Sequence, residues 1–114
     1  MKLSVLERVL LGGMMAMYKG SFINLKLVRK GREAISFNDE ENLKLSFVSL
    51  DGKVTWDPKA SIEFQEVEID LSQTIINIIK DMLQKLNAEE ALTEQHFSLY
   101  EKFMLVYEPL KFVK

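Results

Sequence analysis

The hydrophobic pattern of this chain changes from a helical spacing to alternation at Leu43, shortly before the dipeptide Asp51-Gly52. Apolar residues alternate with other residues on both sides of this dipeptide: Leu43, Leu45, Phe47, Val54 and Trp56. Alternation is the spacing of a β-strand, and Asp-Gly between two such runs indicates a tight turn, because both turn positions need positive φ. We therefore predict a half-buried β-hairpin that pairs Ser49 with Val54 and Phe47 with Trp56.

The residues before the hairpin follow a helical spacing. Ser4-Val5-Leu6-Glu7 has the pattern of a capping box, and we expect Gly12-Gly13 to end or loosen the helix that it begins. Ser21 is a suitable N-cap for a second helix over residues 22–34. Ser36, followed by three acidic residues, predicts a third, short helical turn.

After the hairpin, Asp57-Pro58 predicts the end of the strand. The apolar residues from Ile62 to Ile69 alternate in two opposite phases. A bulge near Gln65-Glu66 would bring them to one face of a third strand of the same sheet. Ser72 is expected to cap the most buried helix, and Thr93 a last helix to about Val106. This last helix should bury four side chains, Phe97, Tyr100, Phe103 and Met104. Helices, a small antiparallel sheet and two further helices make an α+β class.

Composition limits the classes of protein that need consideration. A length of 114 residues fits a single domain over 1–114. The chain has 15 basic and 17 acidic residues, and this balance does not favour binding to phosphates. It has no cysteine, so thiolate catalysis and thiolate zinc sites are excluded. Glu7 and Arg8 interrupt the N-terminal apolar stretch too early for a signal peptide or a membrane span. We therefore expect a cytoplasmic protein with no contact to a membrane.

Residues with catalytic potential are few. His96 is the only histidine, and no nucleophile motif accompanies it, so we interpret it as an exposed or half-exposed helix residue. Glu66, Glu68 and Asp70 alternate on the third predicted strand; such carboxylates are suited to Mg²⁺ or Ca²⁺, or to acid–base chemistry. Charges that protect the edge of a sheet are the favoured explanation of this pattern. We predict neither an enzyme nor a cofactor.

The second predicted helix carries a basic face made of Lys26, Arg29, Lys30 and Arg32. Together with the helix before it, this face loosely resembles a helix-turn-helix, which makes a nucleic-acid-binding regulator the alternative function. The link between the two helices is long for that motif. A solvated basic surface is the simpler interpretation.

Two apolar groups suggest association with a protein. The first combines methionines and a tyrosine: Met14, Met15, Met17 and Tyr18. The second follows the last helix: Leu110, Phe112 and Val113. Thioethers adapt to irregular surfaces, so an exposed group of them is suited to a partner, although filling gaps in a core is their commoner use. These groups predict a protein-interaction module, with a homo-oligomer as the first form to consider.

The segment Thr93-Glu94-Gln95-His96-Phe97-Ser98-Leu99-Tyr100-Glu101-Lys102-Phe103 resembles the C-terminal motif of small uncharacterised proteins found in phage and prophage genomes. Those proteins also open like Leu3-Ser4-Val5-Leu6-Glu7-Arg8 and carry a strand like Val54-Thr55-Trp56 after Asp-Gly. The resemblance covers both ends and the hairpin, and it implies a genomic context with no assigned activity. It also implies a small non-enzymatic accessory protein that binds a host or phage protein.

Overall fold

A computed structural model describes residues 1–64 and 66–105 of the chain. Its first helices are preceded by a short strand: β1 (Lys2–Leu3), α1 (Val5–Ala16), α2 (Phe22–Ile35) and α3 (Asp39–Leu45). The middle holds the hairpin and two further short elements: β2 (Val48–Leu50), β3 (Lys53–Thr55), α4 (Pro58–Glu63) and β4 (Val67–Glu68). The last elements are helical: α5 (Gln73–Ala88), η1 (Glu94–His96), α6 (Phe97–Tyr100) and η2 (Glu101–Leu105). The predicted α+β class is confirmed.

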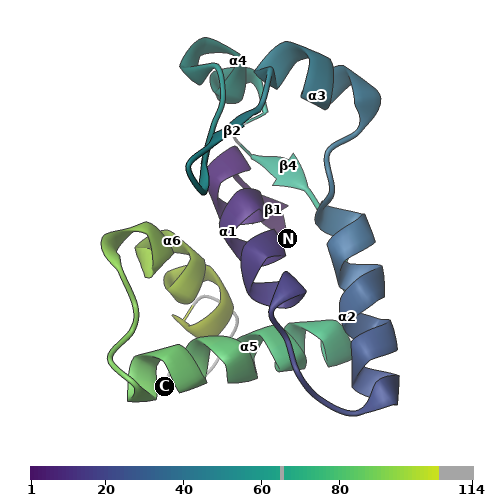
Figure 1. The fold of residues 1–114 in the computed structure, drawn as a ribbon. Coiled ribbons are helices and arrows are strands. Elements are labelled where there is room, and N and C mark those ends of the chain that lie inside the picture. Colours follow the sequence, from purple (N-terminus) through teal and green to yellow (C-terminus); the bar gives the residue numbers. More distant parts are fainter. Residues whose placement is uncertain (65, 106–114) are drawn as a thin grey trace, which may run out of the picture.

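The helices surround a core to which α5 contributes most. Figure 1 shows α5 running across one end of the α1 and α2 pair, with α6 beside it. The buried apolar residues form one cluster: Leu3, Leu11, Met15, Val28, Ile35, Ile69, Leu71, Ile75, Ile76, Ile78, Ile79, Leu83, Leu99 and Phe103. Five of these belong to α5, so the prediction that it is a deeply buried helix is confirmed.

Helix starts match the sequence where a local cap defines them. The Ser4 hydroxyl accepts from the Glu7 amide at 3.2 Å, and the Glu7 carboxylate accepts from the Ser4 amide at 2.8 Å, which is the predicted capping box. Ser21 and Ser72 cap α2 and α5 as expected. Gly12-Gly13 does not end α1, however, because the helix continues to Ala16.

The third helix differs from its prediction at both ends. Asn38, rather than Ser36, is its N-cap, and Glu41 completes a capping box with it. The helix then continues through Leu43 and Leu45, which the alternating pattern assigned to a strand. Only Leu45 is buried, whereas the Leu43 side chain is 80% exposed. The helix ends at Ser46, which adopts a left-handed φ of 51°.

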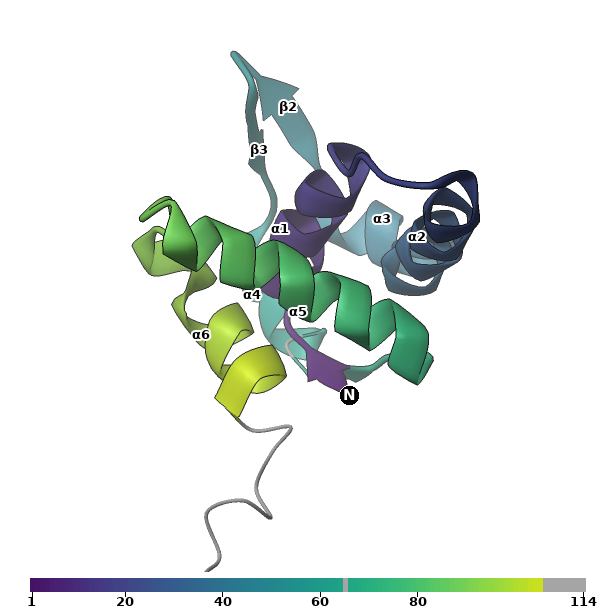
Figure 2. The ribbon, with the colours of Figure 1, turned by 90° about the horizontal axis from the view of Figure 1, so that it is seen from below.

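The hairpin has the predicted register but not the predicted burial. Ser49 pairs with Val54 across the Asp51-Gly52 turn, and both turn residues have positive φ. The rings of Phe47 and Trp56 also meet as predicted, with centroids 6.0 Å apart. Yet every residue of β2 and β3 is exposed, and Figure 2 shows the hairpin projecting beyond the helices.

The expected third strand does not join this hairpin. Asp57 caps the Lys59 amide at 2.9 Å with Pro58 in the first helical position, so the chain starts α4. Beyond α4, Val67–Glu68 pairs with Lys2–Leu3 as a separate two-stranded sheet. The described residues therefore form two small antiparallel sheets rather than one.

The final helical segment is not one α-helix. It opens with the 3₁₀ turn η1, continues as α6 and ends in the π-helical turn η2. These turns hold different numbers of residues, so they rotate the buried face away from that of a straight helix. Leu99 and Phe103 are fully buried, whereas Phe97, which we expected to be buried, is 61% exposed.

Two helix glycines provide a matched test of the packing. A Cβ at Gly31 of α2 would lie 2.5 Å from Met15 Cε and 3.0 Å from Ile75 Cγ2, whereas a Cβ at Gly13 of α1 would meet no atom within 4 Å. We expect Gly13→Ala to raise the free energy of unfolding by about 0.5–1 kcal/mol through helix propensity. Gly31→Ala should lower it, because overpacking a core costs about 1–3 kcal/mol. Urea denaturation of both variants checks this, and equal stabilisation by both would contradict the close approach of the helices.

Candidate functional site

An apolar groove lies between α1 and α5 and has a volume of about 650 Å³. We call it the α1–α5 groove, and it is lined by Val9, Leu10, Gly13, Met14, Met17, Met82, Lys85, Leu86, Glu89 and His96. The α1 residues recur every three or four positions, as do those of α5, so each helix presents one side to the groove. Lys85, Glu89 and His96 add polar groups to walls that are otherwise mostly apolar.

The structure separates the four residues of the predicted methionine group. Met14 and Met17 line the α1–α5 groove, and the Met17 side chain is 79% exposed. Met15 is buried in the core. Tyr18 is half-buried, and its hydroxyl accepts a 3.2 Å hydrogen bond from Asn24. Leu110, Phe112 and Val113, the second predicted group, lie outside the described residues.

The basic face of α2 is exposed as predicted. Lys26, Arg29, Lys30 and Arg32 are all open to solvent, and Lys26 lies 5.7 Å from the centroid of the Phe22 ring. Three of these cations line a second groove of about 330 Å³, the α2 groove, whose residues are Met15, Ala16, Tyr18, Phe22, Leu25, Lys26, Val28, Arg29 and Arg32. It combines an aromatic and aliphatic wall with positive charge.

The carboxylates of the predicted third strand do not converge. Glu66 contacts Lys102 Nζ at 3.1 Å, and Glu68 pairs with the Met1 ammonium group. Both glutamates and Asp70 are exposed. Within the described part of the chain, no three acidic or histidine side chains are grouped as ligands for a metal ion.

His96 is half-buried, which agrees with its interpretation as a helix residue. Its Nδ1 accepts a 3.0 Å hydrogen bond from the Thr93 amide, so the ring takes the place that Glu or Gln has in a common capping box. This bond assigns the proton of the neutral ring to Nε2. The imidazole also borders the α1–α5 groove.

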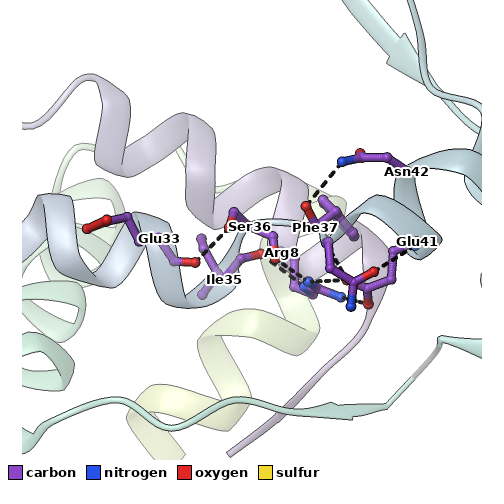
Figure 3. A network of polar contacts seen from close by, with 8 residues as sticks. Arg8, Glu33, Ile35, Ser36, Phe37, Glu41 and Asn42 are labelled. Atoms are coloured by element: carbon purple, nitrogen blue, oxygen red, sulfur yellow. Dashed lines mark hydrogen bonds and ion pairs between the residues drawn. The ribbon is translucent and has the colours of Figure 1, made fainter.

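The two charges of α1 are buried, although no pattern in the sequence predicted it. Arg8 is 3% exposed and Glu7 is 2% exposed. The Arg8 guanidinium donates to both carboxylate oxygens of Glu41, at 2.7 and 3.1 Å. It also donates to the carbonyls of Ile35 and Ser36, at 3.0 and 2.7 Å, and its Cζ lies 4.0 Å from the centroid of the Phe37 ring. Figure 3 shows these contacts.

Glu7 has its own cationic partner. Lys102 Nζ donates to a Glu7 carboxylate oxygen at 2.7 Å and to the Lys2 carbonyl at 2.9 Å. Burial raises the pKa of Glu7, but hydrogen bonds from Lys102 and from the Ser4 amide outweigh it, so this pKa lies below its ordinary value. The Lys102 pKa is raised, because Glu7 and Glu66 outweigh its partial burial.

The Arg8–Glu41 and Glu7–Lys102 ion pairs both have a structural role. The hydrogen bonds of Arg8 lead only to groups within the protein, and Glu41 also accepts from the Asn38 amide at 2.9 Å. No polar side-chain atom buried among the described residues lacks a hydrogen-bond partner. The charged groups thus make their hydrogen bonds within the protein, and we take the two grooves as the candidate binding surfaces.

No family model, no curated protein and no solved structure matches this chain. The resemblance to phage and prophage proteins therefore stays a prediction. None of the described helices is long and apolar enough to cross a membrane.

The buried ion pair can be tested at Glu41. The Arg8 hydrogen bonds hold the pKa of this carboxyl below its ordinary value, so its contribution to stability is complete above about pH 5 and is lost as the pH falls through the lowered folded pKa. Glu41→Gln should lower the free energy of unfolding by about 3–5 kcal/mol at pH 7, because Arg8 stays buried without a counter-charge. It should also reduce the loss of stability in acid.

The control for this variant is Glu40→Gln. Glu40 is exposed and lies 3.9 Å from Lys44, an exposed pair whose loss costs less than about 1 kcal/mol. Urea denaturation from pH 3 to 7 measures both variants. Equal stability of the two at pH 7 would contradict the role that we assign to the Arg8–Glu41 pair.

Proposed function

We propose that this chain is a non-enzymatic protein-interaction module that binds itself or another protein through the α1–α5 groove. The observation that carries the proposal is the groove itself, a cavity of about 650 Å³ walled mainly by apolar side chains of two helices. Met17 is 79% exposed there. Hydrophobic surface of this kind, bordered by polar residues, is typical of a binding groove.

The geometry of the groove favours an amphipathic helix as the bound element. Two helices form its walls, and a third helix that lays its apolar face between them would cover Leu10, Met14 and Leu86. The unbranched methionine side chains adapt to the shape of a partner. Lys85 of α5 and Glu89, the residue after its last turn, offer both signs of charge to the polar side of such a helix.

The biological setting of the proposal comes from the sequence resemblance. A small accessory protein of phage or prophage origin, acting in the cytoplasm on a host or phage protein, agrees with a binding groove. This setting is a proposal about origin and is separate from the physical argument for the groove.

Site-specific photo-cross-linking tests the groove. A benzoylphenylalanine at Met17 places the reactive group on an exposed position of the groove, and the same residue at Gln84 places it on exposed α5 surface that does not line the groove. We expect position 17, and not position 84, to join a defined protein in purified or whole-cell samples. The joined protein should then bind the purified chain, and Met17→Glu should weaken that binding at least about tenfold.

The cross-linking result has a clear negative outcome. Equal labelling at positions 17 and 84, or binding of the joined protein that Met17→Glu leaves unchanged, would contradict the groove as the binding surface. Circular dichroism and thermal unfolding of the Met17→Glu variant confirm that it folds, since the replaced side chain is largely exposed.

A nucleic-acid-binding regulator is the second candidate, and the α2 groove favours it. Arg29 and Arg32 line this groove beside Tyr18 and Phe22, so cations and aromatic rings lie together, as in surfaces that bind single strands. In the described part of the structure, neither arginine has a carboxylate partner. This candidate ranks second because the whole chain carries a net charge of −2.

Fluorescence anisotropy with a labelled single-stranded and a duplex oligonucleotide tests this candidate. If α2 binds nucleic acid, its affinity should fall steeply between 50 and 200 mM salt. The double variant Arg29→Gln with Arg32→Gln should reduce the slope of log affinity against log salt by about one to two, the loss of one or two phosphate contacts. Lys85→Gln, in the other groove, is the control and should change little. No binding at 50 mM salt would remove the candidate.

A further inference from the structure

The geometry of the hairpin points to a self-association site at the outer edge of β2, where a second copy of this chain pairs with it strand to strand. The inference goes beyond the proposed function, because it assigns a second copy of the chain to a separate surface. This surface uses different residues from the α1–α5 groove, so each proposal can fail without the other.

The hairpin is an isolated pair of strands. Within the described residues, β2 and β3 form a sheet of two strands and pair with nothing else, and Figure 2 shows them standing clear of the helices. A two-stranded sheet in water is only marginally stable, and an open strand edge is a template for a further strand. Addition of a strand would therefore stabilise this sheet.

The backbone pattern shows which groups the edge presents. Leu50 and Lys53 flank the two-residue turn, so they form a hydrogen-bonded pair. The next pair, Ser49 with Val54, is a non-hydrogen-bonded pair, because the two kinds alternate along an antiparallel ladder. The amide and carbonyl of Ser49 therefore point outward, away from β3, where a new strand would bind.

This edge is complementary to itself. A twofold axis at Ser49 lets Ser49 and the partner's Ser49 exchange both backbone hydrogen bonds. The same register places Val48 beside the partner's Leu50 on one face, and Leu50 beside the partner's Val48. Val48 is 54% exposed and Leu50 is 70% exposed, so pairing brings four apolar side chains together. β2 carries no charge, and no like charges meet across the axis.

The β3 edge is less suited to the same contact. It contains Lys53, and an edge lysine opposes association of sheets. The opposite face of the hairpin base is held to the body of the protein, since the Phe47 ring packs on Phe37 with centroids 4.8 Å apart. The β2 edge and the face of Val48 and Leu50 are thus the parts that a second copy can reach.

A single cysteine in this cysteine-free chain tests the register. In the proposed dimer, the two residues at position 49 have Cα atoms about 5.5 Å apart, which a disulfide can bridge. Ser49→Cys should therefore form a covalent dimer under mild oxidation. Thr55→Cys is the matched control, because Thr55 is exposed on β3. In the proposed dimer the two residues at position 55 would lie three strand spacings apart, more than about 14 Å, which is too far for a disulfide.

Light scattering after gel filtration, over a range of concentrations, measures the assembly of the unmodified chain. We expect a dimer of twice the 13.2 kDa chain mass, and Leu50→Lys should raise its dissociation constant at least about tenfold. Trp56 is the only tryptophan, so its fluorescence confirms that the Leu50→Lys variant keeps the hairpin.

Each other outcome overturns this inference. A monomer at all concentrations removes the self-association site, but a cross-link to another protein at position 17 would leave the proposed function standing. A dimer that Ser49→Cys does not join, and that Met17→Glu dissociates, would place self-association in the α1–α5 groove. Binding of an extended segment of another protein at β2, without a dimer, would show that the edge is open but that its partner is not a second copy.

Discussion

The buried guanidinium of Arg8 is the interaction on which the arrangement of the first three helices depends. It extends from α1, donates to the Glu41 carboxylate at the start of α3, and donates to the carbonyls of Ile35 and Ser36 at the end of α2. Carbonyl groups at the end of a helix have no partner within the helix. One side chain therefore fixes three helix ends relative to one another, which the planar donor fork of arginine can do and the point charge of lysine cannot.

The same residue connects to the hairpin through a series of aromatic rings. The guanidinium stacks on Phe37, Phe37 packs on Phe47, and Phe47 meets Trp56 edge to face. Contacts of this kind add about 0.5–1.5 kcal/mol each beyond the area that they bury. They explain how a hairpin with exposed strands keeps a defined base. The strands gain little from burial, but Phe47 and Trp56, which flank them, are connected to Arg8 through these rings.

Local signals in the sequence predicted those parts of the fold that local interactions determine. The caps at Ser4, Ser21 and Ser72 and the Asp-Gly turn each depend on a few adjacent residues, and all four were predicted correctly. Pairings between distant residues were not predictable in this way. Arg8 and Glu41 are 33 positions apart, and Glu7 and Lys102 are 95 positions apart. When these distant partners are not known, the local sequence predicts that the two charges of α1 are exposed.

Contacts between distant residues also account for the wrong predictions in the middle of the chain and for the missed half of the candidate site. The alternation at Leu43 and Leu45 was a genuine strand signal, but the cap at Asn38 and the Arg8–Glu41 pair stabilise a helix there. The methionines at 14 and 17 were predicted as binding residues, and both do line the α1–α5 groove. The α5 side of that groove could not be predicted, because Met82 and Leu86 belong to a row of apolar residues at helical spacing, and such a row predicts core residues.

The inward direction of its charges gives α1 an unusual surface, and this is the strongest physical support for a partner at the α1–α5 groove. Glu7 and Arg8 are the only charged residues of the helix, and both are buried in ion pairs. What α1 leaves for the groove is therefore apolar: Val9, Leu10, Gly13, Met14 and Met17. A surface helix normally turns its charges to water and its apolar stripe to the core. Here the helix is apolar on the core side as well, through Leu11 and Met15, so its groove side and its core side are both apolar, as the proposed contact requires.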